Sequence, residues 1–237
     1  MAGVAMRQPM TTAPAGFRLH YVDDSGSHAS GLVSFTWLQL DPEYWAAAEQ
    51  TWLAFRRDLY TRYRIPASRP LHATDLAGGR RSPSLDPGWD ASEHGADVIV
   101  RALEAIGALA GIAVGTVFTR IGSDGFHAAK SGLYRRLTDL LDGDLRQRGQ
   151  HGLVVMDGDG SDPSYAAAHR ALPVSRRLIE APVFRLSETD QWVQMADIAA
   201  WTGFQALRRR RVHGRKLWGW YRSRLGHLDL FGGPREL

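Results

Sequence analysis

Cysteine is absent from this chain of 237 residues, and long apolar runs are absent as well. Without cysteine there are no disulfide bonds, zinc–thiolate sites or thiol catalysis, and nothing indicates an oxidising compartment. No segment approaches the roughly 18–20 consecutive apolar residues of a membrane span. Residues 1–16 carry one arginine and no sustained apolar segment, which predicts a flexible leader rather than a signal peptide. We therefore expect a cytoplasmic protein with no membrane partner.

Lysine is scarce, because only two of the 29 basic residues, Lys130 and Lys216, are lysines. The formal net charge is +4, and arginine supplies nearly all of the positive charge. Arginine forms bidentate contacts with phosphate and stacks on aromatic rings, so the bias is compatible with nucleic-acid binding. A GC-rich coding sequence explains the same bias at least as well, which makes the distribution of charge more informative than its total.

One basic segment, "LRRRRVHGRK" at residues 207–216, is followed closely by Trp218 and Trp220. Positive charge interleaved with aromatic rings can hold phosphates and stack bases. A solvated helix end, whose arginines complement the C-terminal dipole, accounts for the segment equally well. The residues expected to contact DNA or RNA under the first interpretation are Arg208, Arg209, Arg210, Arg211, Arg215 and Lys216.

Strand-like and helix-like segments alternate along residues 17–211, which predicts one domain, with residues 212–237 as a basic-aromatic extension packed on it. The expected strands are residues 17–22, 32–40, 111–122, 151–157 and 181–187, the expected helices are 42–63, 96–110, 128–148 and 188–211, and residues 69–76 are expected to be extended. The first two strands form a hairpin across "DDSGSHASG". This order predicts an α/β fold with a mixed sheet flanked by helices and opening with a β-hairpin.

The last predicted helix contains an isolated carboxylate. Between residues 191 and 207 the only charged residue is Asp197, and its helical neighbours are mostly apolar. Burying a lone carboxylate is costly, so an arginine, several backbone donors or a metal ion must compensate it. The sequence leaves these three possibilities open.

Two further aspartates follow apolar strands. "GLVVM" leads directly into Asp157, at the C-terminal end of a strand, where open α/β sheets bind ligands. In "YVDDSG", alternation places Asp23 on the same face as Leu19 and Tyr21 and places Asp24 on the other face. We therefore expect Asp23 to belong to a site and Asp24 to cap the turn that follows.

Three carboxylates gathered in this way repel one another unless a cation holds them. Carboxylate oxygens suit Mg²⁺ or Mn²⁺, and a pair of such ions about 4 Å apart cleaves phosphodiesters in many enzymes. In "LHATDL", His72 and Asp75 are spaced to share one face of a helical turn and to add a ligand or a general base. Alternatively, His72 hydrogen-bonds to the backbone and Asp75 caps the next element.

The motifs "YVDDSG", "LHATDL", "VVMDGDG" and "SETDQWVQMADIAAWTGF" occur in the order of the DUF3800 family, which is similar to the RNase H-like superfamily. The resemblance covers roughly residues 17–211 and implies an RNase H-like fold. It places Asp23 on the first strand, His72 in the H-A-T motif, Asp157 at a later strand end and Asp197 in the final helix, with Gln194 one turn earlier. The pattern departs from RNase H enzymes because no glutamate stands out on the first long helix.

The function expected from these features is a divalent-metal-dependent nuclease or a related phosphodiester hydrolase. Its substrate would be DNA or RNA, and its metal ligands would be Asp23, Asp157 and Asp197. The alternatives are a non-catalytic nucleic-acid- or protein-binding module with the same fold, and a hydrolase of another phosphate ester. The predicted catalytic residues are Asp23, His72, Asp157 and Asp197, with Asp24, Asp75 and Gln194 in support. The sequence does not indicate an oligomeric state.

Overall fold

The computed structural model describes residues 16–209, 211–212 and 215–237. Residues 1–15 of the predicted leader lie outside the described residues. So does Arg210 of the basic segment, and the side chain of Arg215 is not described.

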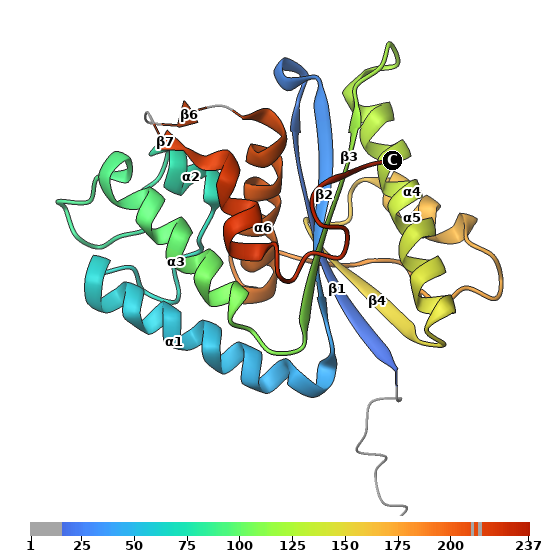
Figure 1. Cartoon of the computed structure of the whole chain (residues 1–237), viewed down its shortest axis with the longest axis horizontal. Helices are drawn as coiled ribbons and strands as arrows, with labels where there is room; N and C mark the ends of the chain where they lie inside the picture. The colour runs from blue at the N-terminus through green and yellow to red at the C-terminus, as the bar shows by residue number, and fades with distance from the viewer. Residues whose placement is uncertain (1–15, 210, 213–214) are drawn as a thin grey trace, which may run out of the picture.

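The described chain is built on a mixed sheet of six strands in the order β5-β4-β1-β2-β3-β8 (Figure 1). The strands are β1 Phe17–Ser27, β2 Leu32–Leu40, β3 Ile112–Arg120, β4 His151–Asp157, β5 Val183–Arg185 and β8 Arg235–Glu236. Strands β1, β2 and β3 pair antiparallel, whereas β4 pairs parallel with β1 and β5, and β8 pairs parallel with β3. The predicted α/β fold, with its mixed sheet and opening hairpin, is confirmed.

Helices cover both faces of the sheet (Figure 1). One face carries α1 Trp45–Tyr63, α2 Ala73–Gly78, α3 Ala96–Gly107 and α6 Gln191–Arg208, and the other carries α4 Gly125–Gln147 and α5 Pro163–Ala171. The shorter elements are the helical turns His28–Ser30, Pro42–Tyr44, Ala91–Gly95, Leu217–Gly219 and Tyr221–Leu225, and the strand pair β6 Arg211–Val212 and β7 Arg215–Lys216. We refer to the two sides as the α6 face and the α4 face.

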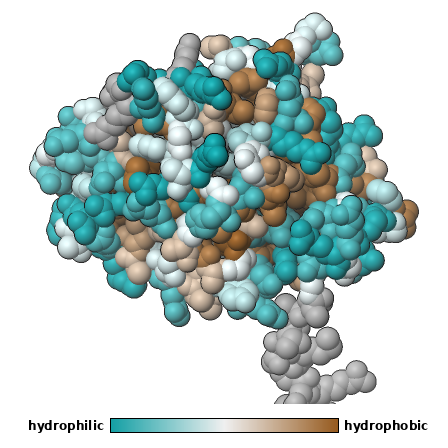
Figure 2. Space-filling view, in the orientation of Figure 1, coloured by the Kyte–Doolittle hydropathy of each residue, from teal (hydrophilic) through white to brown (hydrophobic). Residues whose placement is uncertain are grey.

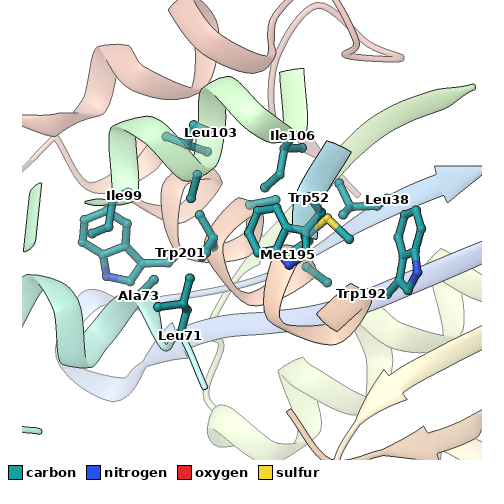
Figure 3. Close-up of a cluster of buried hydrophobic side chains, with 14 of the residues drawn as sticks. Leu38, Trp52, Leu71, Ala73, Ile99, Leu103, Ile106, Trp192, Met195 and Trp201 are labelled. Atoms are coloured by element: carbon teal, nitrogen blue, oxygen red, sulfur yellow. The ribbon is translucent and has the colours of Figure 1, made fainter. Parts of the chain in front are cut away.

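The core on the α6 face is rich in tryptophan. Trp52 of α1 lies beside Met195 of α6, and Trp201 of α6 lies near Leu71 and Ala73 (Figure 3). All five side chains are buried. Burying a large apolar side chain stabilises a fold by about 1.5–3 kcal/mol, so this cluster holds α6 and the segment before α2 firmly together.

The core on the α4 face has a different composition. Val22, Phe35 and Met156 of the sheet pack there against Tyr134 and Leu137 of α4. Because successive strand residues point to opposite faces, Tyr21 and Val22 belong to different cores. The same alternation decides where the two aspartates that follow them point.

The hairpin turn lies further along the chain than the sequence predicts. Strand β1 continues through Ser27, with Asp23 opposite Thr36 and Asp24 opposite Phe35. Asp24 is therefore a ladder residue and does not cap the turn. The turn falls at residues 28–31, where Gly31 takes the left-handed conformation with φ 66°. The extra strand length arises from cross-strand partners in β2, which local sequence does not reveal.

One further prediction of local structure was wrong in part, and one helix was not predicted. Part of the stretch 69–76, expected to be extended, forms the helix α2 from Ala73 onward. Helix α5 was not predicted, although Asp162 caps it by accepting a hydrogen bond from Ser164 N (2.9 Å) and Pro163 occupies its first turn. An aspartate followed by proline is a recognisable helix start, and the buried residues Tyr165, Ala168 and His169 have helical spacing, so a signal for this short helix was present in the sequence.

The C-terminal residues pack against the α6 face and complete the sheet. Leu217, Tyr221 and Leu225 are buried in its core, and β8 adds an edge strand beside β3. In the view of Figure 2, hydrophobic side chains gather in front of the sheet, whereas α1 and α3 present mostly hydrophilic ones. No helix in the described parts of the chain combines the length and apolar character that crossing a membrane requires.

Candidate functional site

Asp23 and Asp157 stand next to each other where two parallel strands stop pairing. The β1–β4 ladder ends at Val22 and Met156, and each aspartate is the following residue of its strand. Neighbouring strands lie about 4.8 Å apart, so the two backbones bring these carboxylates close together. Both aspartates continue the rows of residues that face α6, since Tyr21 and Val155 belong to that core. This is the sheet edge at which α/β folds commonly bind ligands.

Helix α6 brings Asp197 to the same place. A Cβ on Gly203 would lie 2.9 Å from Thr116 Oγ1, so glycine there allows α6 to approach the sheet closely. Asp197 is partly exposed, and its Oδ2 accepts a hydrogen bond from Ala73 N at 2.7 Å. The backbone at the start of α2 is therefore fixed to the carboxylate.

His72 lies beside this contact because of the residues that flank it. Leu71 and Ala73 point into the core near Trp201 (Figure 3), while His72 has an extended backbone and a partly exposed side chain. His72 directly precedes Ala73, whose N–H bonds Asp197 Oδ2, and the charge of His72 acts to lower the pKa of Asp197. His72 and Asp75 also line a cavity of about 170 Å³.

Gln194 links the loops that carry the site. Its Oε1 accepts hydrogen bonds from Arg56 Nη1 (2.7 Å) and Leu71 N (3.2 Å), and its Nε2 donates to Ser187 O (2.7 Å). Ser187 N in turn donates to Asp157 Oδ1 at 3.1 Å. One buried amide thus connects the segment before His72 to the loop that holds Asp157.

The electrostatics of the carboxylates reflect this crowding. Desolvation, followed by the charges of Asp197 and Asp24, raises the pKa of Asp23 well above its usual range. Desolvation also raises the pKa of Asp197 to about 6, helped by Asp157 and Asp75 and opposed by Ala73 N–H and His72. Among the described residues, no lysine or arginine forms an ion pair with Asp23, Asp157 or Asp197.

The carboxylates fit a divalent cation by their chemistry more than by their present arrangement. Within residues 16–209, 211–212 and 215–237, no three histidine, aspartate or glutamate side chains are already arranged to hold a metal ion. The donor chemistry nevertheless suits a hard cation, because the groups are carboxylates without a cationic partner. Asp157 and Asp197 each have one oxygen tied to a backbone N–H, and the second oxygen accepts no hydrogen bond from the described chain. Metal binding would therefore require the carboxylates to turn toward a common point.

Asp24 lies on the α4 face and has a partner. Its Oδ1 is 2.8 Å from Lys130 Nζ, and that ammonium group is 5.8 Å from the centre of the Tyr165 ring. Burial acts to lower the pKa of Lys130, but Asp24 and Tyr165 outweigh it and raise the pKa. Asp24 therefore supports the fold from the opposite face and does not join the other carboxylates.

The basic segment lies away from the carboxylates. Arg208, which ends α6, is about 16 Å from Asp197 along the helix axis at 1.5 Å per residue, and its guanidinium group lies 5.5 Å from the centre of the Phe204 ring. Arg209 follows as an exposed residue with φ 51°. Arg211 of β6 pairs with Lys216 of β7, and Lys216 Nζ lies 6.0 Å from the centre of the Trp218 ring.

Arg56 was not among the residues expected at the site, and it is fully buried at the centre of the network. Besides Gln194 it contacts Gln191 Oε1 (3.1 Å) and the carbonyl oxygens of Pro66 (3.0 Å) and Arg69 (2.5 Å). A signal was present, because Arg56 lies four residues after Trp52, on the stripe of α1 that faces the core. A charged residue on an apolar helix face indicates a buried polar network.

Comparisons with protein-family models and with curated proteins found no match to this chain.

Proposed function

We propose that this chain is a divalent-metal-dependent nuclease, or a related phosphodiester hydrolase, with an RNase H-like fold. The observation that carries the proposal is the gathering of Asp23, Asp157 and Asp197 from three separate elements without an ion-paired lysine or arginine in the described chain. Carboxylates that repel one another in this way attract a cation. Membership of the DUF3800 family is part of the proposal and rests on the motifs that contain these residues.

The residues have distinct roles in this proposal. Asp23, Asp157 and Asp197 would hold Mg²⁺ or Mn²⁺, which prefer carboxylate oxygens. In phosphodiester cleavage such ions activate water and stabilise the leaving oxygen. His72, which lies beside Asp197, would act as a general acid or base. Asp75, whose charge already acts on Asp197, would add a further acidic group.

Nucleic acid is the proposed substrate, and the basic segment would bind its backbone. Arg208 lies about 16 Å from Asp197 at 1.5 Å per residue of helix. Phosphates of a helical strand rise about 3.4 Å per nucleotide, so the segment would contact phosphates several nucleotides from the cleaved bond. The structure describes the side chains of four members of this set, Arg208, Arg209, Arg211 and Lys216. A cytoplasmic setting is included in the proposal.

Cleavage assays with matched aspartate variants test the proposal. Purified protein with Mn²⁺ or Mg²⁺ is expected to cut at least one of single-stranded DNA, double-stranded DNA, RNA and the hybrid. Asp157→Asn and Asp197→Asn should each lower the rate at least about 100-fold, because even residues behind a metal ligand cost 10- to 100-fold. Asp159→Asn is the control, since Asp159 is exposed in the turn two residues after Asp157 and accepts from Ser161 N.

Melting temperatures with and without Mn²⁺ provide an independent measurement. A ligand that binds only the folded state raises its stability by RT ln(1 + [L]/Kd), so a shift that disappears in Asp197→Asn supports the metal site. No cleavage and no shift would contradict the proposal. Salt-sensitive binding of nucleic acid under those conditions would favour the alternative, a non-catalytic binding module that uses the basic segment.

A further inference from the structure

A small cavity lies beside the carboxylates, between the segment that leads into α2 and the loop that follows this helix. Its volume is about 170 Å³, and its lining includes Arg69, His72, Asp75, Arg81 and Ser82. Pockets for drug-sized ligands run from about 300 to 1,000 Å³, so this cavity suits a single small group. His72 belongs both to this lining and to the surroundings of Asp197.

The lining carries more positive than negative charge. Arg69 and Arg81 are exposed, and neither forms an ion pair with a carboxylate of the described chain. Asp75 is the acidic residue of the lining, and His72 adds an imidazole ring. Two such guanidinium groups around one cavity favour an oxyanion, because each can donate two parallel hydrogen bonds to it.

One wall of the cavity is held in place by the buried network. Arg56 Nη2 donates to Arg69 O at 2.5 Å, and Leu71 N donates to Gln194 Oε1 at 3.2 Å. The backbone on both sides of Pro70 is therefore fixed before any ligand arrives. A fixed wall reduces the entropy lost on binding.

A larger hollow shares part of its wall with this cavity. The second space has a volume of about 540 Å³, shares Arg81 and Ser82 with the first, and extends to Trp89. It offers room for a sugar and a base next to a group held by Arg81. An aromatic ring at its wall suits a base, because base–aromatic stacking tolerates any sequence.

We propose that Arg69 and Arg81 bind one phosphate group of a single polynucleotide strand, whose adjoining nucleoside occupies the hollow beside Trp89. This inference rests on the proposed function and deepens it, because it assigns the substrate path to the α2 side of the carboxylates. The arginines supply the attraction for phosphate that three carboxylates cannot supply.

Binding measured without metal tests this assignment. Fluorescence anisotropy would follow a single-stranded oligonucleotide of about 12 nucleotides, within the usual site sizes, in EDTA so that no cleavage occurs. Arg69→Gln and Arg81→Gln are each expected to weaken binding about tenfold, the effect of one charge-assisted contact. Each should also reduce the slope of log K against log salt by about 0.7. Added inorganic phosphate should compete with the oligonucleotide in the unaltered protein and less well in Arg81→Gln.

Arg80→Gln is the matched control, because Arg80 is exposed and adjacent to Arg81 but lines neither space. It should change the affinity less than twofold at physiological salt, where screening acts over about 8 Å. Equal losses in Arg80→Gln and Arg81→Gln, or no loss in Arg69→Gln, would overturn the assignment. If the arginine effects hold but no metal-dependent cleavage occurs, the phosphate site stands and the nuclease proposal fails. If metal-dependent cleavage occurs but both variants bind as the unaltered protein does, the nuclease proposal stands and the phosphate site fails.

Discussion

Asp23 and Asp24 are adjacent in β1 but point to opposite faces of the sheet, and the two faces treat their charges differently. On the α4 face, Asp24 lies 2.8 Å from Lys130 Nζ. On the α6 face, Asp23 lies near Asp197 and Asp157, and its pKa is raised by desolvation and by these like charges. Compensated charge is what a folded structure needs for stability. In the described chain, the α6 face carries these uncompensated charges, which supports placing the proposed site there.

The buried cation of the α6 face reinforces the contrast. Arg56 is fully buried and donates to the amide oxygens of Gln191 and Gln194 and to two backbone carbonyl oxygens. Desolvation lowers its pKa to about 10. The α6 face thus contains both a buried cation and crowded acids, yet the cation is used to fix loops and not to neutralise the acids.

The largest expected effect on stability comes from removing this cation. Arg56→Met would remove the side-chain donor of the Pro66 and Arg69 carbonyl oxygens, and each such loss costs about 1–3 kcal/mol. Gln191 Oε1 and Gln194 Oε1 would each keep one donor, Trp52 Nε1 and Leu71 N. We expect the free energy of unfolding in urea to fall by about 3–5 kcal/mol. Arg57→Met on the exposed side of the same helix should change it by less than about 0.5 kcal/mol. A small loss in Arg56→Met would mean that water satisfies these oxygens and that the network does not fix the loops.

The long periodic elements of the fold could be predicted from the sequence. The helix expected at residues 128–148 is found at Gly125–Gln147, and the apolar strand before Asp157 is found at His151–Asp157. Periodicity succeeds there because burial on one face determines the residue pattern. It did not give the end of β1 or the start of α2, which depend on cross-strand pairs and on contacts with α6. These partners are distant in sequence.

The candidate site was predictable only in part, for the same reason. Alternation along β1 places Asp23 with Tyr21 and Asp24 with Val22, as the structure has them. The role of Gln194 could not be derived locally, because its partner Arg56 is 138 residues away in sequence. The phosphate-binding assignment to Arg81 likewise depends on a cavity formed by two loops around α2.

The next largest expected effect is on the pH dependence of folding stability, and it arises from Asp197 on the α6 face. The pKa of Asp197 is raised to about 6, so the folded state favours the protonated carboxyl group. The protonated Asp197 carboxyl group contributes its full stabilisation below the pKa of aspartate in the unfolded chain, near 3.9. This contribution is lost as the pH rises through about 6. In EDTA, Asp197→Asn should therefore gain about 2 kcal/mol relative to the unaltered protein between pH 4 and pH 7. Urea titrations at several pH values measure this difference, and a constant difference would show that Asp197 is compensated after all.

The smallest expected change in stability concerns the ion pair of Asp24 and Lys130 on the α4 face. Here, substitution of the aspartate is expected to lower the stability of the fold, whereas Asp197→Asn is expected to raise it. Asp24 and Lys130 have side-chain exposures of 27% and 22%, so their ion pair is neither fully solvated nor fully buried. Asp24→Asn and Lys130→Met should each destabilise the fold, and a double-mutant cycle should give a coupling energy of about 1 kcal/mol. The coupling should weaken in high salt, because solvent still reaches both groups. Asp23→Asn should instead stabilise the metal-free protein at neutral pH, because desolvation and the charge of Asp197 make the ionised Asp23 carboxylate unfavourable in the folded state. If both aspartate variants lost stability, the two faces would not differ in the way their charges are compensated, and Asp23 would be a structural residue like its neighbour.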